Sequence, residues 1–528
     1  MGSSKRYIYL PIIFALLLVL GIYIGYRYSF HTRPVGLASD EKVEKLLNYV
    51  QKRYVDTINQ IQLEDKALNS LLQNLDPHSS YVTAKEAKAM NEPLEGNFGG
   101  IGIEFNIIKD TIRVVSAISG GPSEALGILA GDMIVKVEGK NVGGVKITNQ
   151  QVIEKLRGES GTKVNISIKR RAVKKLIDFS ITRGEIPIFS VDAAYMVNSK
   201  TGYVKISRFG ATTYEEYMKA FEDLRAKGMS ALILDLRGNP GGYLNAAVML
   251  ADEFLSAGKE IVHTQGRADP KKVHLATAQG EFEKNKLVIL VDEGSASASE
   301  IVAGAIQDND RGTIVGRRSF GKGLVQEQKE FDDGSAVRLT IARYYTPTGR
   351  CIQKSYEGGL EAYYSEEIDR YNKGELQSAD SIKFADSLKF KTPAGKVVYG
   401  GGGIMPDVFV PLDTNGRTIY LSEVTYSGLL NQFAFDYADQ NRNQLKANKS
   451  FEQFNKAFAV SDQLLEEFVS FAEKNKIKRK DTEIKKSASI LKTQLKALIA
   501  RNIWSNAGYF PIIHTIDNTF KKAVELAE

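Results

Sequence analysis

The sequence has very little cysteine and histidine. Cys351 is the only cysteine in 528 residues, so neither an internal disulfide framework nor a cysteine zinc site can form. A lone cysteine can act as a nucleophile, although it more commonly packs in the protein interior. The five histidines do not occur in the HExxH spacing of zinc proteases. We therefore expect no metal and no cofactor, and a catalytic mechanism, if there is one, that does not use histidine.

A strong excess of one charge is also missing. The 70 basic and 63 acidic side chains give a formal net charge of +7, which is modest for this length. The basic residues are scattered among acidic ones, so the sequence has no basic patch of the kind that binds nucleic acid. We expect no nucleic acid partner.

One long uncharged run stands at the amino terminus. Residues 7–26 carry no charge, and about 20 apolar residues match the ~30 Å hydrocarbon core of a bilayer. The short basic flank of residues 1–6 predicts a cytoplasmic amino terminus, with the rest of the chain outside. A cleaved signal peptide is the alternative, but its apolar core is usually about 7–15 residues long and precedes a small-residue cleavage site. The longer run here favours a retained single-pass transmembrane anchor.

The rest of the chain changes character several times. A juxtamembrane linker over residues 27–38 precedes a helical pattern over 39–90. Residues 91–183 combine glycine with short β-like runs and predict a compact module. Residues 184–412 alternate buried strands with helices, which is typical of α/β architecture with sites at strand ends. Residues 413–528 predict a polar helical region without a catalytic motif.

The most informative stretch contains the run SASASE. A buried strand ends at Asp292, and small residues then turn the chain into a helix. A serine at such a turn lies near free backbone N–H groups and the positive end of the helix, which suit the oxyanion of an acyl-transfer intermediate. The alternative is that Ser295, Ser297 and Ser299 are only helix caps and turn formers.

Lys322 follows in the sequence FGKG, ahead of Leu324 and Val325. A free lysine has a pKa near ~10.4 and is protonated at neutral pH. Burial among apolar groups lowers this pKa and produces a neutral amine that can act as a base, as in serine–lysine pairs. The alternative is an ordinary surface lysine in a turn.

Two glycine-containing loops also need interpretation. Residues 316–322 read G-x-x-x-x-G-K, but Gly323 stands where a phosphate-binding loop has Ser or Thr, and a strand-like LVQEQ follows instead of a helix. Nucleotide binding is therefore disfavoured.

The RGNPGG loop, residues 237–242, follows a buried strand, and its glycines permit close backbone approach to a ligand. It is either an oxyanion donor or a tight strand-to-helix connection.

These motifs together resemble the carboxyl-terminal processing proteases, also called tail-specific proteases. The resemblance is carried by SASASEIVAGAIQD, GRRSFGKGLVQ, LDLRGNPGG, GGIGIEF and VYGGGGIMPDV, in the family's order over roughly residues 40–412. It implies an α/β catalytic core similar to the Clp-protease and crotonase folds, with an inserted PDZ domain at 91–183. The remaining parts are the transmembrane helix and the helical region after residue 412, whose role stays open.

The resemblance also implies roles for particular residues. Ser297 corresponds to the nucleophile, Lys322 to the general base and Gln326 to the residue that orients the lysine. Asp308 matches a family aspartate with a structural role. The oxyanion donors correspond to the backbone of Ala298 and of one glycine in the RGNPGG loop, and the choice between Gly241 and Gly242 stays open at this point.

The PDZ-like part has its own candidate residues. A PDZ domain pairs a peptide as an added strand and binds its terminal carboxylate through backbone amides. The loop that corresponds to the carboxylate site consists of Gly99, Gly100, Ile101, Gly102 and Ile103. Arg157 corresponds to the arginine that links peptide binding to the active site in this family. A plain β-turn is the alternative for the loop.

The resulting expectation is a serine endopeptidase that cleaves exported or envelope proteins near their carboxyl termini. Its partners would be unfolded or C-terminally tagged proteins and the bacterial inner membrane, with the catalytic part in the periplasm and homo-oligomerisation left open. The alternative is a catalytically inactive PDZ scaffold that binds envelope proteins. The joint presence of Ser297, Lys322 and Gln326 argues against the scaffold.

Overall fold

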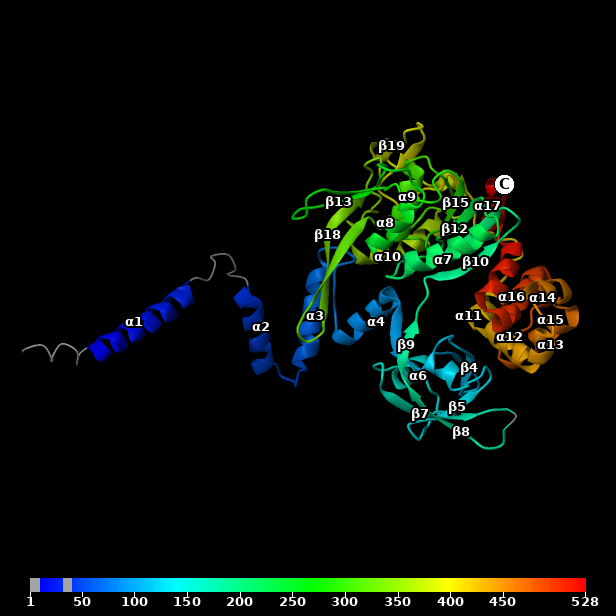
Figure 1. Cartoon of the computed structure of the whole chain (residues 1–528), viewed down its shortest axis with the longest axis horizontal. Helices are drawn as coiled ribbons and strands as arrows, with labels where there is room; N and C mark the ends of the chain where they lie inside the picture. The colour runs from blue at the N-terminus through cyan, green and yellow to red at the C-terminus, as the bar shows by residue number, and fades with distance from the viewer. Residues whose placement is uncertain (1–9, 32–39, 172) are drawn as a thin grey trace, which may run out of the picture. The chain divides into compact units, whose positions relative to one another are not determined.

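The computed structural model describes residues 10–31, 40–171 and 173–528 (Figure 1). The chain divides into two compact units, which comprise residues 1–71 and 72–528. In the first unit the described helices are α1 (Leu10–His31), α2 (Asp40–Arg53) and most of α3 (Gln60–Gln73).

The predicted membrane segment falls in this first unit. Residues 7–9 lie outside the described residues, and residues 10–26 lie in α1, whose side chains are described from residue 13 to residue 23. Within the described parts of the chain, no helix combines the length and the apolar character needed to cross a bilayer.

The second unit contains a small β-rich module that corresponds to the predicted PDZ domain. Its sheet has the strand order β3-β4-β5-β7-β8, with β6 paired to β5. Side chains alternate between buried and exposed along β7, because one sheet face packs on α6 and the other does not. The elements are β3 (Ile103–Ile107), β4 (Ile112–Ala117), α5 (Pro122–Ala125), β5 (Met133–Val137), β6 (Lys140–Asn141), α6 (Asn149–Leu156), β7 (Lys163–Lys169) and β8 (Ile177–Thr182).

Two short strands close this module where the chain enters and leaves it. β2 (Asn97–Gly100) pairs antiparallel with β9 (Gly184–Pro187). Helix α4 (Ala84–Glu95) leads into β2 and begins with a capping box between Thr83 and Glu86.

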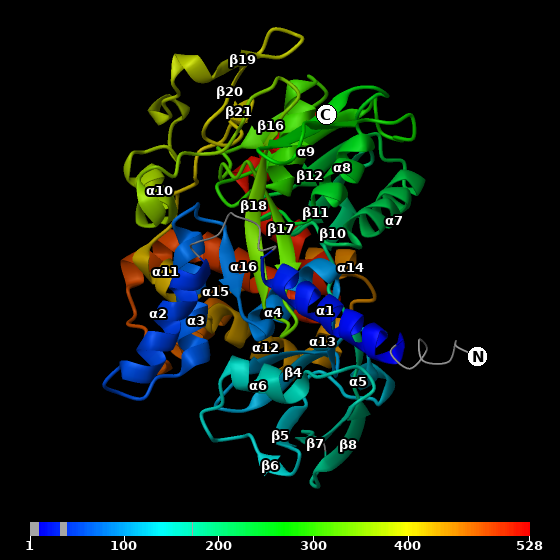
Figure 2. The ribbon, with the colours of Figure 1, turned by 90° about the vertical axis from the view of Figure 1, so that its left-hand side faces the viewer.

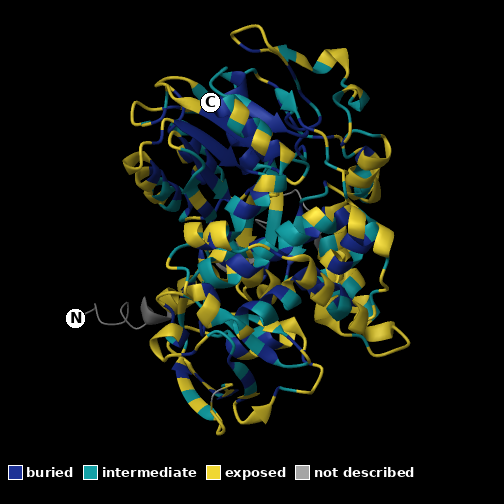
Figure 3. Cartoon of the chain, turned by 90° about the vertical axis from the view of Figure 1, so that its right-hand side faces the viewer, coloured by how far each residue is buried: buried dark blue, intermediate teal, exposed yellow. Residues whose placement is uncertain are grey.

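The centre of the second unit is a six-stranded sheet with the order β10-β11-β12-β15-β16-β21. All neighbours are parallel except β10 and β11. Figure 3 shows these strands largely in dark blue, as expected for a sheet covered on both faces. The strands are β10 (Val191–Met196), β11 (Thr201–Ile206), β12 (Ala231–Asp235), β15 (Lys286–Val291), β16 (Thr313–Gly316) and β21 (Val408–Phe409).

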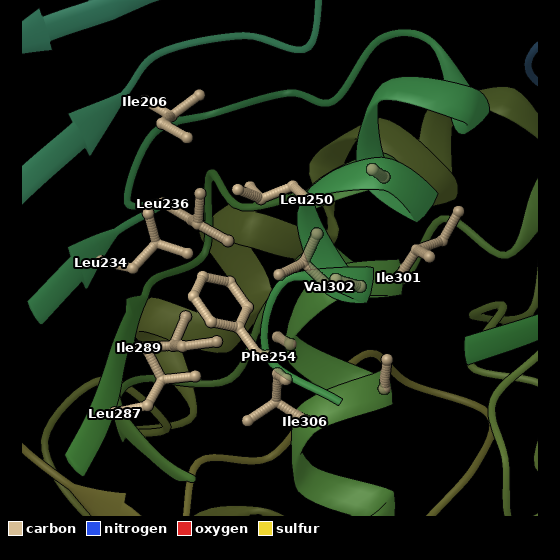
Figure 4. Packing of buried hydrophobic residues seen from close by; sticks show 14 of the residues in the cluster. Ile206, Leu234, Leu236, Leu250, Phe254, Leu287, Ile289, Ile301, Val302 and Ile306 are labelled. Carbon is tan, nitrogen blue, oxygen red and sulfur yellow. The ribbon is translucent and has the colours of Figure 1, made fainter. Parts of the chain in front are cut away.

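Alternate residues of the central strands face different cores. Leu234 and Ile289 pack with helices α7 (Thr213–Ala226), α8 (Leu244–Asp252) and α9 (Ala298–Asp308), as Figure 4 shows for α8 and α9. Ile233 and Leu290 face the other way and pack against the last helix, α17 (Asn518–Ala527). Because successive side chains of a strand point to opposite faces, both faces of the sheet are covered by helices, and the ends of the strands lead into the loops.

A second sheet carries a long hairpin beside the first. Its order is β1-β18-β13-β14, with β17 paired to β18, and Figure 2 shows β17 and β18 side by side. The strands are β1 (Ser80–Val82), β13 (Glu260–Gly266), β14 (Lys272–Leu275), β17 (Leu324–Glu330) and β18 (Ala336–Tyr345). Helix α10 (Gly359–Asn372) and the pair β19 (Lys389–Lys391) and β20 (Val397–Tyr399) follow in the chain.

The region after residue 412 is helical, as its sequence predicts, and most of it has a core of its own around Phe454 and Phe468. Helix α16 is interrupted at Trp504 and Ser505, where the backbone leaves the helical region. The helices are α11 (Ile419–Tyr426), α12 (Leu429–Gln440), α13 (Arg442–Lys446), α14 (Phe451–Ala457), α15 (Asp462–Lys474) and α16 (Asp481–Ile513).

Candidate active site

Ser297 lies in the turn between β15 and α9, as the strand–turn–helix pattern predicts. Its backbone has φ +55° and ψ −112°, a conformation that is strained for a residue with a side chain. Neighbouring hydrogen bonds hold the turn in place. The Ala296 N–H donates to the Asn239 carbonyl (3.0 Å), and the Ser299 hydroxyl donates to the same oxygen (2.9 Å). Hydrogen bonds to the RGNPGG loop thus maintain the strained conformation of the turn.

Gly241 of this loop lies directly against the Ser297 turn. A Cβ atom at Gly241 would stand 2.8 Å from the Ser297 Cβ and 2.9 Å from the Ala298 nitrogen, so a side chain there would clash. Gly241 has φ +101°, which also favours glycine. The close approach that the sequence predicts for the loop is therefore present.

The loop contains one engaged and one unengaged candidate donor. The Gly241 N–H donates to the Asn239 side-chain oxygen (2.8 Å). In the part of the chain that the structure describes, neither the Gly242 N–H nor the Ala298 N–H donates a hydrogen bond. The geometry therefore favours Gly242 over Gly241 as the second candidate oxyanion donor.

Lys322 lies just before β17, and its ammonium group has a defined partner. Its Nζ donates to the Gln326 Oε1 (3.0 Å), and the Gln326 Nε2 donates to the His78 carbonyl (2.6 Å), which fixes the orientation of the amide. Burial, with a further effect of Arg338, lowers the pKa of Lys322, although the charge of Glu300 acts in the opposite direction. The environment thus favours a neutral amine.

All the predicted catalytic residues line one cavity of about 460 Å³. They are Ser297, Ala298, Lys322, Gln326, Gly241 and Gly242. Asn91 and Leu94 of α4 form another part of its wall. A larger cleft of about 1210 Å³ lies between the small β-rich module and the helical region, and none of the predicted catalytic residues lines it.

Glu300 was not predicted as a site residue, yet it joins the two halves of the site. Its buried carboxylate accepts hydrogen bonds from the backbone N–H groups of Ser297 (2.8 Å) and Lys322 (2.9 Å). It also accepts from the Gly321 N–H (2.7 Å) and the Ser319 hydroxyl. Burial raises the pKa of Glu300 to about 7, while these hydrogen bonds oppose the rise. The S-x-x-E spacing of a capping box is the signal that could have identified it.

Tyr344 and Asp308 also support the site. The Tyr344 hydroxyl lies 3.1 Å from the Ser297 carbonyl oxygen and 2.7 Å from that of Lys322, so it too bridges the two segments. Asp308 forms a fully buried ion pair with Arg350 (2.7 Å) and accepts from the Thr348 hydroxyl (2.7 Å). These partners are consistent with a structural Asp308.

The predicted carboxylate loop forms the turn from β2 to β3. Gly99 and Gly100 end β2, Gly102 has φ +73°, and Ile103 begins β3. β3 is an edge strand of its sheet, and among the described strands none pairs with its outer edge. A Cβ atom at Gly99 would stand 2.1 Å from the Gly158 carbonyl oxygen, which places the loop against the end of α6.

Arg157 follows α6 and contacts both the carboxylate loop region and α4. Its guanidinium lies 4.0 Å above the centre of the Phe98 ring and forms an ion pair with Glu92. Because Asn91 and Leu94 of the same helix line the catalytic cavity, Arg157 connects the module to the cavity wall through α4.

The glycine-rich stretch before Lys322 does not open a helix. Residues 316–322 lead from β16 into strand β17, whereas a phosphate-binding loop opens a helix. Among the described residues, no group of three or more His, Cys, Asp or Glu side chains could hold a metal ion.

Comparison with known proteins matches three families. Peptidase family S41 matches residues 200–362, the PDZ domain family matches residues 113–170, and a family of unknown function matches residues 420–505. The candidate catalytic residues lie within the first match. The carboxylate loop lies before the PDZ match.

Individual relatives cover much of the chain. The carboxy-terminal-processing protease of Bartonella bacilliformis is 40% identical over 309 residues, which are 58% of this chain and 70% of that protein. The carboxy-terminal processing protease CtpA of Bacillus subtilis is 35% identical over 346 residues, 65% of this chain and 72% of that protein. A solved photosystem II D1 C-terminal processing protease is 26% identical, with a TM-score of 0.36, covering 70% of this chain and 92% of that one.

Proposed function

The chain belongs to the carboxyl-terminal processing proteases, serine-type peptidases of family S41 that carry a PDZ domain, and we propose that Ser297 and Lys322 are its nucleophile and base. The observation that carries the proposal is the convergence of both residues, with Gln326 and two unengaged N–H groups, on one cavity. A catalytically inactive PDZ scaffold is not favoured, because it does not require this convergence.

The reaction follows from the protonation state of Lys322. The neutral Nζ takes the proton of the Ser297 hydroxyl while Oγ attacks the carbonyl carbon of the scissile peptide bond. Lys322 then returns this proton to the departing amine, and the C–N bond breaks to leave an acyl-enzyme. Water attacks the ester, again losing a proton to Lys322, and that proton passes to Ser297 as the new carboxyl group leaves. Gln326 holds the amine in place through its side-chain oxygen.

The oxyanion of each tetrahedral intermediate needs preorganised donors. We assign this role to the N–H groups of Ala298 and Gly242. The Gly241 N–H is already engaged by Asn239 and serves to shape the loop.

The PDZ domain implies peptide or protein substrates, and we propose that it recognises their carboxyl termini. The turn from Gly99 to Ile103 offers backbone N–H groups to a terminal carboxylate, and the free edge of β3 offers main-chain pairing. The contact between Arg157 and Glu92 would transmit the binding of a peptide in the PDZ domain to α4 and the cavity wall.

Exported or envelope proteins are the proposed substrates, and the proposed location is the outer face of a bacterial inner membrane. The uncharged run of residues 7–26, with its basic flank, supports that location.

The proposal is tested by incubating the full chain in detergent with an unfolded protein that has a free, apolar carboxyl end. Mass spectrometry should detect fragments with the wild-type enzyme and none with Ser297→Ala, because removing a nucleophile costs several orders of magnitude in rate. Ser295→Ala and Ser299→Ala serve as matched serine controls and should be milder. Retained cleavage by a folded Ser297→Ala variant would refute the assignment, and a wild-type chain that binds but does not cut would favour the scaffold.

A further inference from the structure

The last helix of the chain is part of the catalytic core. Helix α17 follows the helical region but leaves it and packs on the central sheet beside β12 and β15 (Figure 1). Phe520, Ala523 and Ala527 are buried there with Ile233 and Leu290. The carboxyl-terminal segment therefore covers one face of the sheet whose strands β12 and β15 lead into the two catalytic loops.

Asp517 stands at the start of this helix and has two hydrogen-bonding roles. Its Oδ1 accepts from the Phe520 N–H (3.0 Å) and caps α17, while its Oδ2 accepts from the Arg237 Nη1 (2.7 Å). The other nitrogens of Arg237 are bound by Asp235, with Nη2 2.6 Å from Oδ2 and Nε 3.0 Å from Oδ1. Arg237 is thus held between two carboxylates, one from the core and one from the carboxyl-terminal segment.

Arg237 is the first residue of the RGNPGG loop. The next residue, Gly238, donates its N–H to Asp292 (2.7 Å), and the Asn239 carbonyl accepts from Ala296 in the Ser297 turn (3.0 Å). Gly242, the proposed oxyanion donor, lies at the end of the same loop. Because glycine leaves this backbone with many accessible conformations, its alignment with Ser297 depends on such attachments.

We propose that Asp517 is a positioning residue that holds Arg237, and through it the RGNPGG loop, in alignment with Ser297. This inference rests on the proposed function of the loop, and it gives the region after residue 412 a role in catalysis. Hydrogen bonds between ionised groups are roughly twice as strong as neutral ones, so the pair is suited to fixing the loop. A 1 Å misplacement in an active site can cost about 100-fold in rate. Because Asp235 still holds Arg237 when Asp517 is changed, we expect a smaller displacement of the loop and a fall in turnover of about tenfold.

The informative variant is Asp517→Asn. Deleting the segment from residue 517 onward would uncover the buried sheet face and risks unfolding the chain. Asparagine caps helices about as well as aspartate, so α17 keeps its cap while the ion pair with Arg237 is lost. Glu525→Gln is the matched control, since it removes the same charge from the same helix at an exposed position, where Glu525 pairs with Lys522 (2.8 Å).

The first measurement is hydrogen exchange of the full chain, followed over residues 236–244. Asp517→Asn should speed exchange in this segment, whereas Glu525→Gln should not. This measurement does not depend on proteolysis, so it separates the inference from the proposed function. Unchanged exchange in Asp517→Asn would overturn the inference even if the wild-type enzyme cleaves its substrate.

The second measurement is steady-state cleavage of a peptide. Asp517→Asn should lower kcat about tenfold, with KM within twofold and the melting temperature close to that of the wild type. If Asp517 only fastens the segment to the core, the melting temperature would fall and kcat would stay, which also overturns the inference. Faster exchange with unchanged kcat would show that the loop does not need this attachment for turnover, and would likewise count against it.

Discussion

Replacing Glu300 with glutamine should damage both stability and catalysis. Each carboxylate oxygen of Glu300 faces two donors: Oε1 faces the Ser319 hydroxyl and the Gly321 N–H, and Oε2 faces the N–H groups of Ser297 and Lys322. An amide carries an acceptor on one side only. In either orientation of the glutamine, two donors therefore lose their acceptor in a site where Glu300 has no solvent exposure.

The size of the effect follows from these lost partners. A buried polar group without a partner costs about 1–3 kcal/mol, so at pH 8, where Glu300 is mostly ionised, Glu300→Gln should lower the free energy of unfolding by roughly 2–6 kcal/mol. Because the Ser297 and Lys322 backbones are both held by this carboxylate, kcat should also fall, by about 100-fold if either moves 1 Å.

The effect should depend on pH. The pKa of Glu300 is raised from its ordinary 4.5 to about 7, so the protonated form is favoured by folding. Its contribution to stability is complete below pH 4.5 and is lost as pH rises through 7. That contribution is about 3 kcal/mol at 1.36 kcal/mol per pKa unit. Glutamine does not titrate, so the difference in stability between wild type and Glu300→Gln should be larger at pH 5 than at pH 8.

Urea unfolding at both pH values tests this reasoning, with peptide cleavage measured in parallel. Glu357→Gln is the control, because Glu357 is exposed. Wild-type stability in Glu300→Gln would show that the four hydrogen bonds contribute little. An equal loss at pH 5 and pH 8 would refute the pKa argument while leaving the hydrogen-bond argument intact.

Four further predictions concern the base, the absence of a metal requirement, the substrate end and the PDZ link. Lys322→Arg should be inactive, since a guanidinium stays protonated, and wild-type activity should rise with pH as the lowered pKa of Lys322 is passed; a flat pH profile would contradict this. A chelator should have no effect, and inactivation reversed by zinc would overturn the metal-free mechanism. Amidating the carboxyl end of a peptide should weaken its binding by about 1–3 kcal/mol, measured by calorimetry, and equal cleavage of acid and amide would remove the tail-recognition proposal. Arg157→Ala should slow cleavage of a substrate with a free carboxyl end more than cleavage of its amide. Equal slowing of both would mean that Arg157 does not link peptide binding in the PDZ domain to the active site.

The strand–turn–helix at Ser297 could be predicted from the sequence because it depends on local patterns. A fully apolar strand, a run of small residues and a helical period are adjacent in the chain. Lys322 and LVQEQ could be interpreted for the same reason, since the strand β17 begins two residues after the lysine. The family resemblance then supplied the roles that a local pattern cannot assign.

Contacts between distant segments could not be predicted in this way. Gly241 and Gly242 are equivalent in a sequence motif, and only the engagement of the Gly241 N–H by Asn239 separates them. Asp517 lies 280 residues from Arg237, and nothing in its neighbourhood indicates that it caps a helix returning to the catalytic sheet. Glu300 carried a local signal, but its bonds to residues 319–322 depend on the turn before β17.

The proposed serine–lysine mechanism requires that the scaffold position the lysine amine. A lysine side chain has four flexible methylene groups, so proximity to a serine does not by itself fix its amine. Here Gln326 fixes the tip of the side chain, while Glu300 and Tyr344 fix its backbone to that of Ser297. The same burial that lowers the pKa of Lys322 also raises that of Glu300. Desolvation therefore favours the neutral form of both groups, and for Lys322 this is the form that the proposed role as a base requires.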